Sequence, residues 1–293
     1  MKSAIIIYHA VDLDGYCSAA LFKKYLKVDK INLYKWSYSY DLPALSKLLT
    51  YNYIVLLDLT FPFEYMKELI LATNKSFNTF IWIDHHELND KIILDWCKTE
   101  KISIFGKRDS SMAACGLCWE YINPSEPMPK AIKLLSDYDA WHDENTEYWE
   151  NEVVPFQYYA KTFFNSADKV YNNLEDMYEN VDNYINDGKL LYKLQQNIWA
   201  KSIKGAYKKI LKINDIDYNC IVLNTQDRSS LQFGEFKYLY DILICWNYNG
   251  KTYNYSFYSY KDNVDCAVLC KTLFDGGGHK DAAGGMSSTN ILL

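Results

Sequence analysis

Short apolar runs alternate with helix-compatible segments along the first part of the chain. The apolar runs are rich in Ile, Val, Leu, Tyr, Phe and Trp, as buried strands are, and they cover residues 3–8, 31–36, 53–58 and 79–84. The segments between them fit helices near residues 16–27, 43–50 and 62–74. Because strands that alternate with helices of this length form a parallel sheet covered on both faces, we predict an N-terminal α/β domain.

The pattern changes further along the chain. Residues from about 111 to 205 fit mostly helices, and four more strands follow, at 208–214, 217–224, 239–247 and 251–260. Asn249-Gly250 is typical of a hairpin turn between the last two strands. A helix near 264–273 and a cluster of glycines close the chain. We therefore predict a first domain over 1–195 that includes a helical extension, a linker at 196–210, and a smaller α/β domain over 211–293.

Composition and net charge indicate which kinds of partner, such as nucleic acid or a membrane, the protein is not expected to bind. The net charge is −6, whereas proteins that hold nucleic acid by blanket phosphate neutralisation are usually basic, so stable duplex binding is not expected. No apolar run approaches the roughly 20 residues of a membrane span, and the N-terminus lacks the features of a signal peptide. These features favour a cytoplasmic protein that does not bind membranes. Its eight cysteines are then expected as reduced thiols, with Cys115 and Cys118 buried on a helix face.

Acidic and histidine side chains fall where predicted strands end. His9, Asp12 and Asp14 follow the first strand, Asp58 ends the third, and Asp84-His85-His86 ends the fourth. Ligands of open parallel sheets bind at the carboxyl ends of the strands, so these clusters are expected to meet at one edge. Carboxylates with a minority of imidazoles suit Mn²⁺, or Mg²⁺, better than zinc. Several carboxylates suggest two ions, which together can activate a water and stabilise an in-line displacement at phosphorus.

The motifs then resemble a known family. Asp84-His85-His86, preceded by the apolar residues 80–83, resembles the motif that names the DHH phosphoesterases. Four other segments resemble further motifs of that family in the family's order: residues 9–15, 57–58, 110–115 and 134–137. Gly276-Gly277-Gly278-His279, with Ala282-Ala283-Gly284, is similar to the GGGH signature of the C-terminal domain that accompanies DHH domains. The resemblance spans nearly the whole chain and implies a manganese-dependent phosphoesterase.

The resemblance also implies a ligand set for two metal ions. One ion would be bound by His9 and Asp12, the other by Asp14, His85 and Asp137, and Asp58 would bridge both. Asp139 competes with Asp137 for its role, and the preceding Leu-Leu-Ser favours Asp137. The fifth histidine, His142, is expected at a helix end or on the surface.

The remaining motif residues are implied to act on the substrate. Asp84 would orient His85, and His86 would face the substrate phosphate. In the C-terminal signature, the backbone N–H groups of Gly276, Gly277 and Gly278 would approach a phosphate, and His279 would donate to it.

One departure from the family concerns substrate anchoring. Members that cut oligonucleotides carry an arginine on the strand before the glycine motif, whereas residues 255–261 contain none. Tyr258 is a candidate for stacking on a base. Arg108 or Lys261 is a candidate for the missing positive charge.

The preferred function is hydrolysis of short single-stranded oligonucleotides or small nucleotides to nucleoside monophosphates, as in members that act as oligoribonucleases or on 3′-phosphoadenosine 5′-phosphate. The enzymatic alternatives are a phosphoanhydride hydrolase acting on pyrophosphate or polyphosphate, and a cyclic dinucleotide phosphodiesterase. The alternative from another class is an inactive nucleotide-binding module. A homodimer is possible, and the sequence does not decide it.

Overall fold

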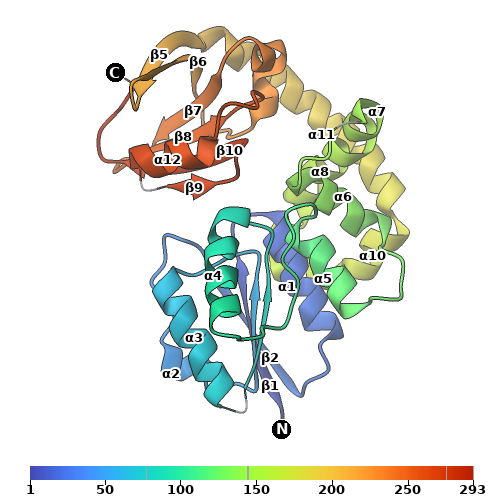
Figure 1. Ribbon diagram of the computed structural model, residues 1–293. Helices are drawn as coiled ribbons and strands as arrows, with labels where there is room; N and C mark the ends of the chain where they lie inside the picture. Colours follow the sequence, from blue (N-terminus) through green and yellow to red (C-terminus); the bar gives the residue numbers. More distant parts are fainter. Residues whose placement is uncertain (77, 144, 275, 293) are drawn as a thin grey trace. The chain divides into compact units, whose positions relative to one another are not determined.

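The computed structural model describes residues 1–76, 78–143, 145–274 and 276–292. They form two compact units, Met1–Tyr192 and Lys193–Leu293 (Figure 1). The long helix α11 (Val181–Ser202) carries the chain from the first unit into the second. Each unit has its own sheet and its own hydrophobic core.

The first unit contains a four-stranded parallel sheet, which confirms the predicted α/β class. Its strands, in spatial order, are β2 (Lys30–Trp36), β1 (Ser3–His9), β3 (Tyr53–Leu57) and β4 (Thr79–Ile83). All three pairings are parallel. The predicted apolar runs match these strands to within one residue. The carboxyl ends of the strands therefore meet at one edge, as the parallel arrangement requires.

Helices cover both faces of this sheet, as predicted. They are α1 (Leu13–Tyr25), α2 (Leu45–Leu48), α3 (Phe63–Lys75) and α4 (Glu87–Thr99). One core cluster joins strand residues such as Ile54 and Trp82 to Met66 of α3 and Ile93 of α4. Helix α1 contacts β1 and β3 and also packs on α5 (Ala114–Ile122) (Figure 1). The strand side chains are thus divided between two helical layers.

Helix α1 begins earlier than its apolar pattern predicts. Asp12 is its N-cap and accepts a hydrogen bond from the backbone N–H of Gly15 at 3.1 Å. A Cβ at Gly15 would lie 1.9 Å from the carbonyl oxygen of His9, so only glycine lets the helix start so close to the strand. The tight turn from β1 into α1 brings Asp12 and Asp14 to the sheet edge.

The rest of the first unit is helical, as predicted. The elements are α5, α6 (Lys130–Asp139), α7 (Thr146–Tyr148), the π-helical turn η1 (Trp149–Val153), α8 (Val154–Phe163), α9 (Ala167–Asn172), α10 (Leu174–Glu179) and α11. Cys115 and Cys118 lie buried in α5 and, like the other six cysteines, are free thiols. Among the described residues, no helix is long and apolar enough to cross a membrane.

The second unit is built on a six-stranded mixed sheet. Its elements are η2 (Ile203–Gly205), β5 (Tyr207–Ile213), β6 (Ile216–Asn224), η3 (Ser230–Tyr238), β7 (Ile242–Tyr248), β8 (Tyr253–Tyr258), α12 (Cys266–Phe274), β9 (Gly277–Gly278) and β10 (Ala282–Ser287). Their order in the sheet is β5-β6-β7-β8-β10-β9. Asn249 and Gly250 form the predicted hairpin turn, in which the Asn249 side chain accepts from the N–H groups of Lys251 and Thr252. The sequence did not indicate β10, because its Ala-Ala-Gly-Gly composition lacks the usual residues of strands.

Gly106 and Gly205 offer a matched test of the packing beside β4. Gly106 has φ +111°, and a Cβ there would lie 1.9 Å from the carbonyl oxygen of Trp82, whereas nothing lies within 4 Å of a Cβ at Gly205. Gly106→Ala should therefore lower the free energy of unfolding by roughly 2–4 kcal/mol, from left-handed backbone strain and overpacking together. Gly205→Ala should change it little. Urea unfolding of both variants measures the difference, and equal values would contradict this packing.

Candidate metal centre

Asp58 lies at the middle of the carboxylate and histidine cluster. It follows β3 directly and is 2% exposed. Its Oδ2 is 3.5 Å from Nδ1 of His9, and its Oδ1 is 3.5 Å from Nε2 of His85. The backbone of Asp58 has φ +58°, a strained value for a residue with a side chain. Its N–H donates to the carbonyl of Ile83 at 2.9 Å. The chain therefore turns sharply here and places one carboxylate between two imidazoles.

Asp12 and Asp14 complete two groups around this carboxylate. Asp12 Oδ2 is 3.6 Å from His9 Nδ1, and Asp14 Oδ2 is 3.7 Å from His85 Nε2. Possible ligand atoms of His9, Asp12 and Asp58 all lie within 4.8 Å of one another, and the same holds for Asp14, Asp58 and His85. The two groups share Asp58. The structure thus brings together five of the six residues expected as metal ligands.

Asp14 is held in place by a helix that the sequence did not connect to it. Its carboxylate accepts hydrogen bonds from the backbone N–H groups of Ala114 and Cys115, at 2.9 and 2.6 Å. These groups lie at the N-terminus of α5, where unpaired donors and the helix dipole favour a negative charge. The start of α5 therefore fixes the position of a carboxylate about a hundred residues earlier in the chain.

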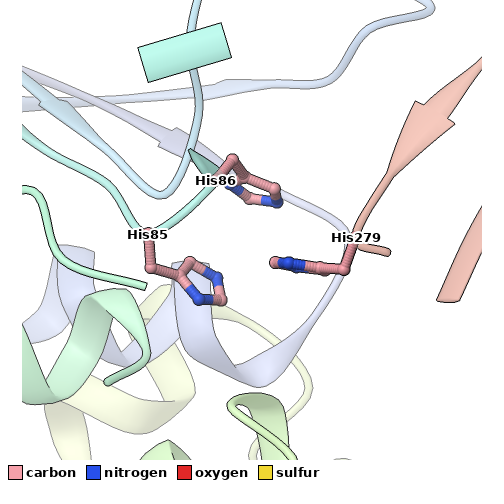
Figure 2. Close-up of side chains that lie close together, drawn as sticks. All are labelled: His85, His86 and His279. Carbon is pink, nitrogen blue, oxygen red and sulfur yellow. The ribbon is translucent and has the colours of Figure 1, made fainter. Parts of the chain in front are cut away.

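Asp84 contacts His86 through the imidazole ring and His85 through the backbone N–H. Its Oδ1 accepts from the backbone N–H of His85 at 2.9 Å and lies 2.7 Å from Nδ1 of His86. Its Oδ2 accepts from the hydroxyl of Thr60 at 2.6 Å. Figure 2 shows the imidazoles of His85 and His86, whose centroids are 4.7 Å apart at an angle of 59°. The adjacent histidines therefore have different surroundings: His85 lies among carboxylates, and His86 is held by Asp84.

The structure brings Asp139, and not Asp137, to the cluster. Asp139 Oδ2 is 3.3 Å from Nε2 of His85. Asp137 instead accepts from the ammonium of Lys133 at 2.6 Å and the hydroxyl of Tyr148 at 2.7 Å, and lies 3.2 Å from Nδ1 of His142. Residues two apart on a helix point in different directions, so both cannot face His85. The Leu-Leu-Ser pattern before Asp137 does not reveal this. His142 lies just after the end of α6, as expected.

Burial and the repulsion between neighbouring carboxylates shift the pKa values of the acidic and histidine side chains in the cluster. Burial raises the pKa of Asp14 well above its usual value, and the charges of Asp58 and Asp139 raise it further. Burial would also raise the pKa of Asp58, but the imidazoles of His85 and His9, each 3.5 Å from one of its oxygens, outweigh it and lower the pKa. For His85, burial alone would lower the pKa, yet Asp139 and Asp58 raise it well above the usual value. Negative charge in the cluster thus exceeds what the imidazoles compensate.

The excess negative charge of the cluster suits the binding of divalent cations. Asp58 Oδ2 is buried and has no hydrogen-bond partner among the residues that the structure describes. A buried carboxylate oxygen without a donor is costly unless a cation approaches it. The donors are carboxylate oxygens with a minority of imidazole nitrogens, a set that suits Mn²⁺ or Mg²⁺ better than zinc. The residues present therefore fit two divalent ions that share Asp58.

The C-terminal glycines serve close packing within the second unit. A Cβ at Gly276 would lie 2.1 Å from the carbonyl oxygen of Gly284, and one at Gly278, where φ is +143°, would lie 2.6 Å from that of Ala282. A Cβ at Gly277 would meet nothing within 4 Å. The N–H of His279 donates to Ala282 at 2.8 Å. Gly276 and Gly278 therefore bring β9 against β10, and the space where a Cβ of Gly277 would lie is open.

The candidates for substrate anchoring all contact backbone carbonyls. The guanidinium of Arg108 donates to Trp82 and Phe105, at 2.8 and 3.1 Å. The ammonium of Lys261 donates to the carbonyl of Tyr238 at 2.9 Å. The hydroxyl of Tyr258 donates to the carbonyl of Arg228. Each side chain thus braces its own unit.

Part of the first unit matches a known protein family. Residues 4–140 match the model of the DHH family, N-terminal domain. The matched residues include the four-stranded sheet and the carboxylates and histidines at its edge. The C-terminal GGGH domain, which is outside this match, stays a prediction.

Three individual proteins align with this chain at low sequence identity. An uncharacterized protein of Acanthamoeba polyphaga mimivirus is 27% identical over 304 residues, and the alignment covers 96% of this chain but only 66% of the relative's length. A structure of an uncharacterized protein from Helicobacter pylori G27 aligns with a TM-score of 0.43 and 17% identity, over 100% of this chain and 95% of that one. An exopolyphosphatase-related protein from Bacteroides fragilis aligns with a TM-score of 0.46 and 14% identity, over 99% and 88%. At these values, neither structural likeness bears on the function.

Divalent cations should stabilise the protein through Asp58. Adding Mn²⁺ to the metal-free protein should raise the free energy of unfolding by about 2.7 kcal/mol once the free ion exceeds its Kd a hundredfold. In Asp58→Asn this increase should largely disappear, because both groups share that carboxylate. Asp168→Asn, which alters an exposed ion pair with Lys23, is the control and should respond like the parent protein. Thermal unfolding with and without Mn²⁺ measures the effect. An unchanged response in Asp58→Asn would remove this carboxylate from the site.

Proposed function

We propose that this protein is a divalent-metal-dependent hydrolase that cuts phosphodiester bonds in short oligonucleotides or small nucleotides and releases nucleoside monophosphates. The observation that carries the proposal is the pair of ligand groups that share Asp58. Two adjacent divalent ions supply the chemistry of in-line phosphoryl transfer, since they activate a water and stabilise the charge on the attacking and leaving oxygens. The match to the DHH family supports the same class.

The proposed ligands follow the two groups. His9, Asp12 and Asp58 would hold one ion, and Asp14, Asp58 and His85 the other, with Asp139 in the role first given to Asp137. The support for Asp139 is its distance of 3.3 Å from His85. Mn²⁺ is the proposed ion because of the histidines in the set, and Mg²⁺ would satisfy the carboxylates alone.

His86 is proposed to contact the substrate phosphate. Its Nδ1 is held by the buried carboxylate of Asp84, which fixes the orientation of the ring. Burial would lower the pKa of His86, but the charge of Asp84 outweighs it and raises the pKa to about 9. An imidazolium held this way can donate to a phosphate oxygen as charge develops there.

The second unit is proposed to hold another phosphate of the substrate. The support is the open space where a Cβ of Gly277 would lie and the histidine two residues later in the same signature, His279. Such an arrangement could bind an anion without lysine or arginine.

A substrate panel tests the proposed function. The protein loaded with Mn²⁺ should hydrolyse dinucleotides or 3′-phosphoadenosine 5′-phosphate faster than pyrophosphate, polyphosphate or cyclic dinucleotides. Chelation should abolish the activity, and Asp58→Asn should lack it. Chromatography of the released mononucleotides provides the measurement. Hydrolysis of pyrophosphate alone would replace the proposed reaction with phosphoanhydride cleavage. Binding of dinucleotides without any turnover would indicate an inactive module.

The adjacent histidines should respond differently to substitution. His85→Ala should lower the Mn²⁺ content, because it removes a ligand. His86→Ala should keep its Mn²⁺ content and lose roughly 10²–10³-fold in kcat, the usual effect of removing one donor to a developing oxyanion. Metal analysis after gel filtration and steady-state kinetics measure the two effects. Similar metal loss in both variants would contradict their separate roles.

A further inference from the structure

The buried carboxylate of Asp137, near the end of α6, contacts three polar side chains that are exposed or partly exposed. Asp137 is 5% exposed. Its Oδ2 accepts from Lys133 and Tyr148, at 2.6 and 2.7 Å, and its Oδ1 lies 3.2 Å from His142 Nδ1. Both oxygens are thus engaged within the protein, and the carboxylate is held firmly.

The chain around Asp139 is fixed by these contacts and by aromatic packing. Helix α6 ends at Asp139, and the next turn contains Trp141 with φ +58°. The N–H of His142 donates to the carbonyl of Asp137 at 2.9 Å, which closes the turn. Tyr138 stacks on Trp149 with centroids 5.5 Å apart and planes at 3°, and Trp141 meets the same ring at 4.9 Å. The residues on both sides of Asp139 are therefore anchored to one ring.

Tyr148 connects these two sets of contacts. It ends the short helix α7 and directly precedes the π-helical turn η1, which begins at Trp149. π-Helical turns are rare and often occur at functional sites. The hydroxyl of Tyr148 reaches Asp137, while the next residue provides the ring on which Tyr138 and Trp141 pack. The turn thus connects the buried carboxylate to the end of α6.

Asp137 and Asp139, at the end of α6, contact different partners. Residues two apart point to different sides of a helix. Asp137 faces Lys133 and Tyr148, and Asp139 faces His85. We propose that Asp137 and Tyr148 are positioning residues that hold Asp139 at the metal centre. The inference rests on the ligand role of Asp139 given under the proposed function.

A double-mutant cycle on Mn²⁺ affinity tests the inference. Tyr148→Phe removes only the hydroxyl that binds Asp137. It should weaken the binding of one Mn²⁺ by roughly 10–100-fold, as is usual when the partner of a ligand is lost. Asp139→Asn should weaken the same ion. In the Asp139→Asn background, Tyr148→Phe should cause no further loss, because its effect passes through Asp139. Titration followed by the electron paramagnetic resonance of free Mn²⁺ measures the affinities without relying on turnover.

Two control variants separate positioning from general stability. Tyr65→Phe removes another tyrosine hydroxyl of the first unit, which donates to the carbonyl of Pro43, and should leave Mn²⁺ affinity unchanged. Lys133→Met removes a second donor to Asp137 and should also weaken the binding of the same Mn²⁺ ion. It replaces Tyr148→Phe as the test if Tyr148→Phe does not fold. Equal losses from Tyr148→Phe in both backgrounds would overturn the inference, and so would unchanged affinity in Tyr148→Phe and Lys133→Met. If Asp139→Asn keeps full affinity, the inference and this ligand both fail, while Mn²⁺-dependent hydrolysis would still support the proposed function.

Discussion

Repulsion among buried carboxylates is the constraint on which the first unit depends. Asp14, Asp58 and Asp84 are each at most 2% exposed, and in a medium of low dielectric constant their charges cannot remain uncompensated. Imidazoles compensate part of the charge: His9 and His85 flank Asp58, and His86 accompanies Asp84. Backbone N–H groups of α5 compensate part of the rest at Asp14. The raised pKa of Asp14 means that protons balance the remainder in the metal-free protein, and divalent cations would replace these protons on binding.

The fold provides the precision that such a cluster needs. Parallel strands deliver three segments to one edge, and each segment is then fixed by a different device. Gly15 lets α1 start against the carbonyl of His9, a left-handed backbone turns Asp58 inward, and Thr60 with Asp84 holds His86. These devices store strain or require a particular residue, which is typical of sites that must hold a fixed geometry. Rigid strands and caps thus take the place of flexible loops.

Sequence patterns predicted the strands, the parallel sheet and most of the cluster, because continuous apolar runs and the residues at their ends are local features. They failed where tertiary contacts decide. Asp137 and Asp139 differ only in the direction each faces on α6, and the contact of Tyr148 with Asp137 depends on how the next helix returns. The sequence also does not indicate which histidine ring contacts the carboxylate of Asp84, since His85 and His86 are both close to it in the chain. Strand β10 was not predicted from the sequence, because its pairing with β8, and not its composition, makes it a strand.

The sharing of Asp58 by two ions is the central claim, and the electronic coupling between bound Mn²⁺ ions tests it most directly. The protein saturated with Mn²⁺ should bind two ions per chain, and its electron paramagnetic resonance spectrum should show exchange coupling through the common carboxylate. Asp58→Asn should lose that coupling together with at least one ion. A parent protein that binds a single Mn²⁺, or two ions whose spectra are uncoupled, would contradict the account.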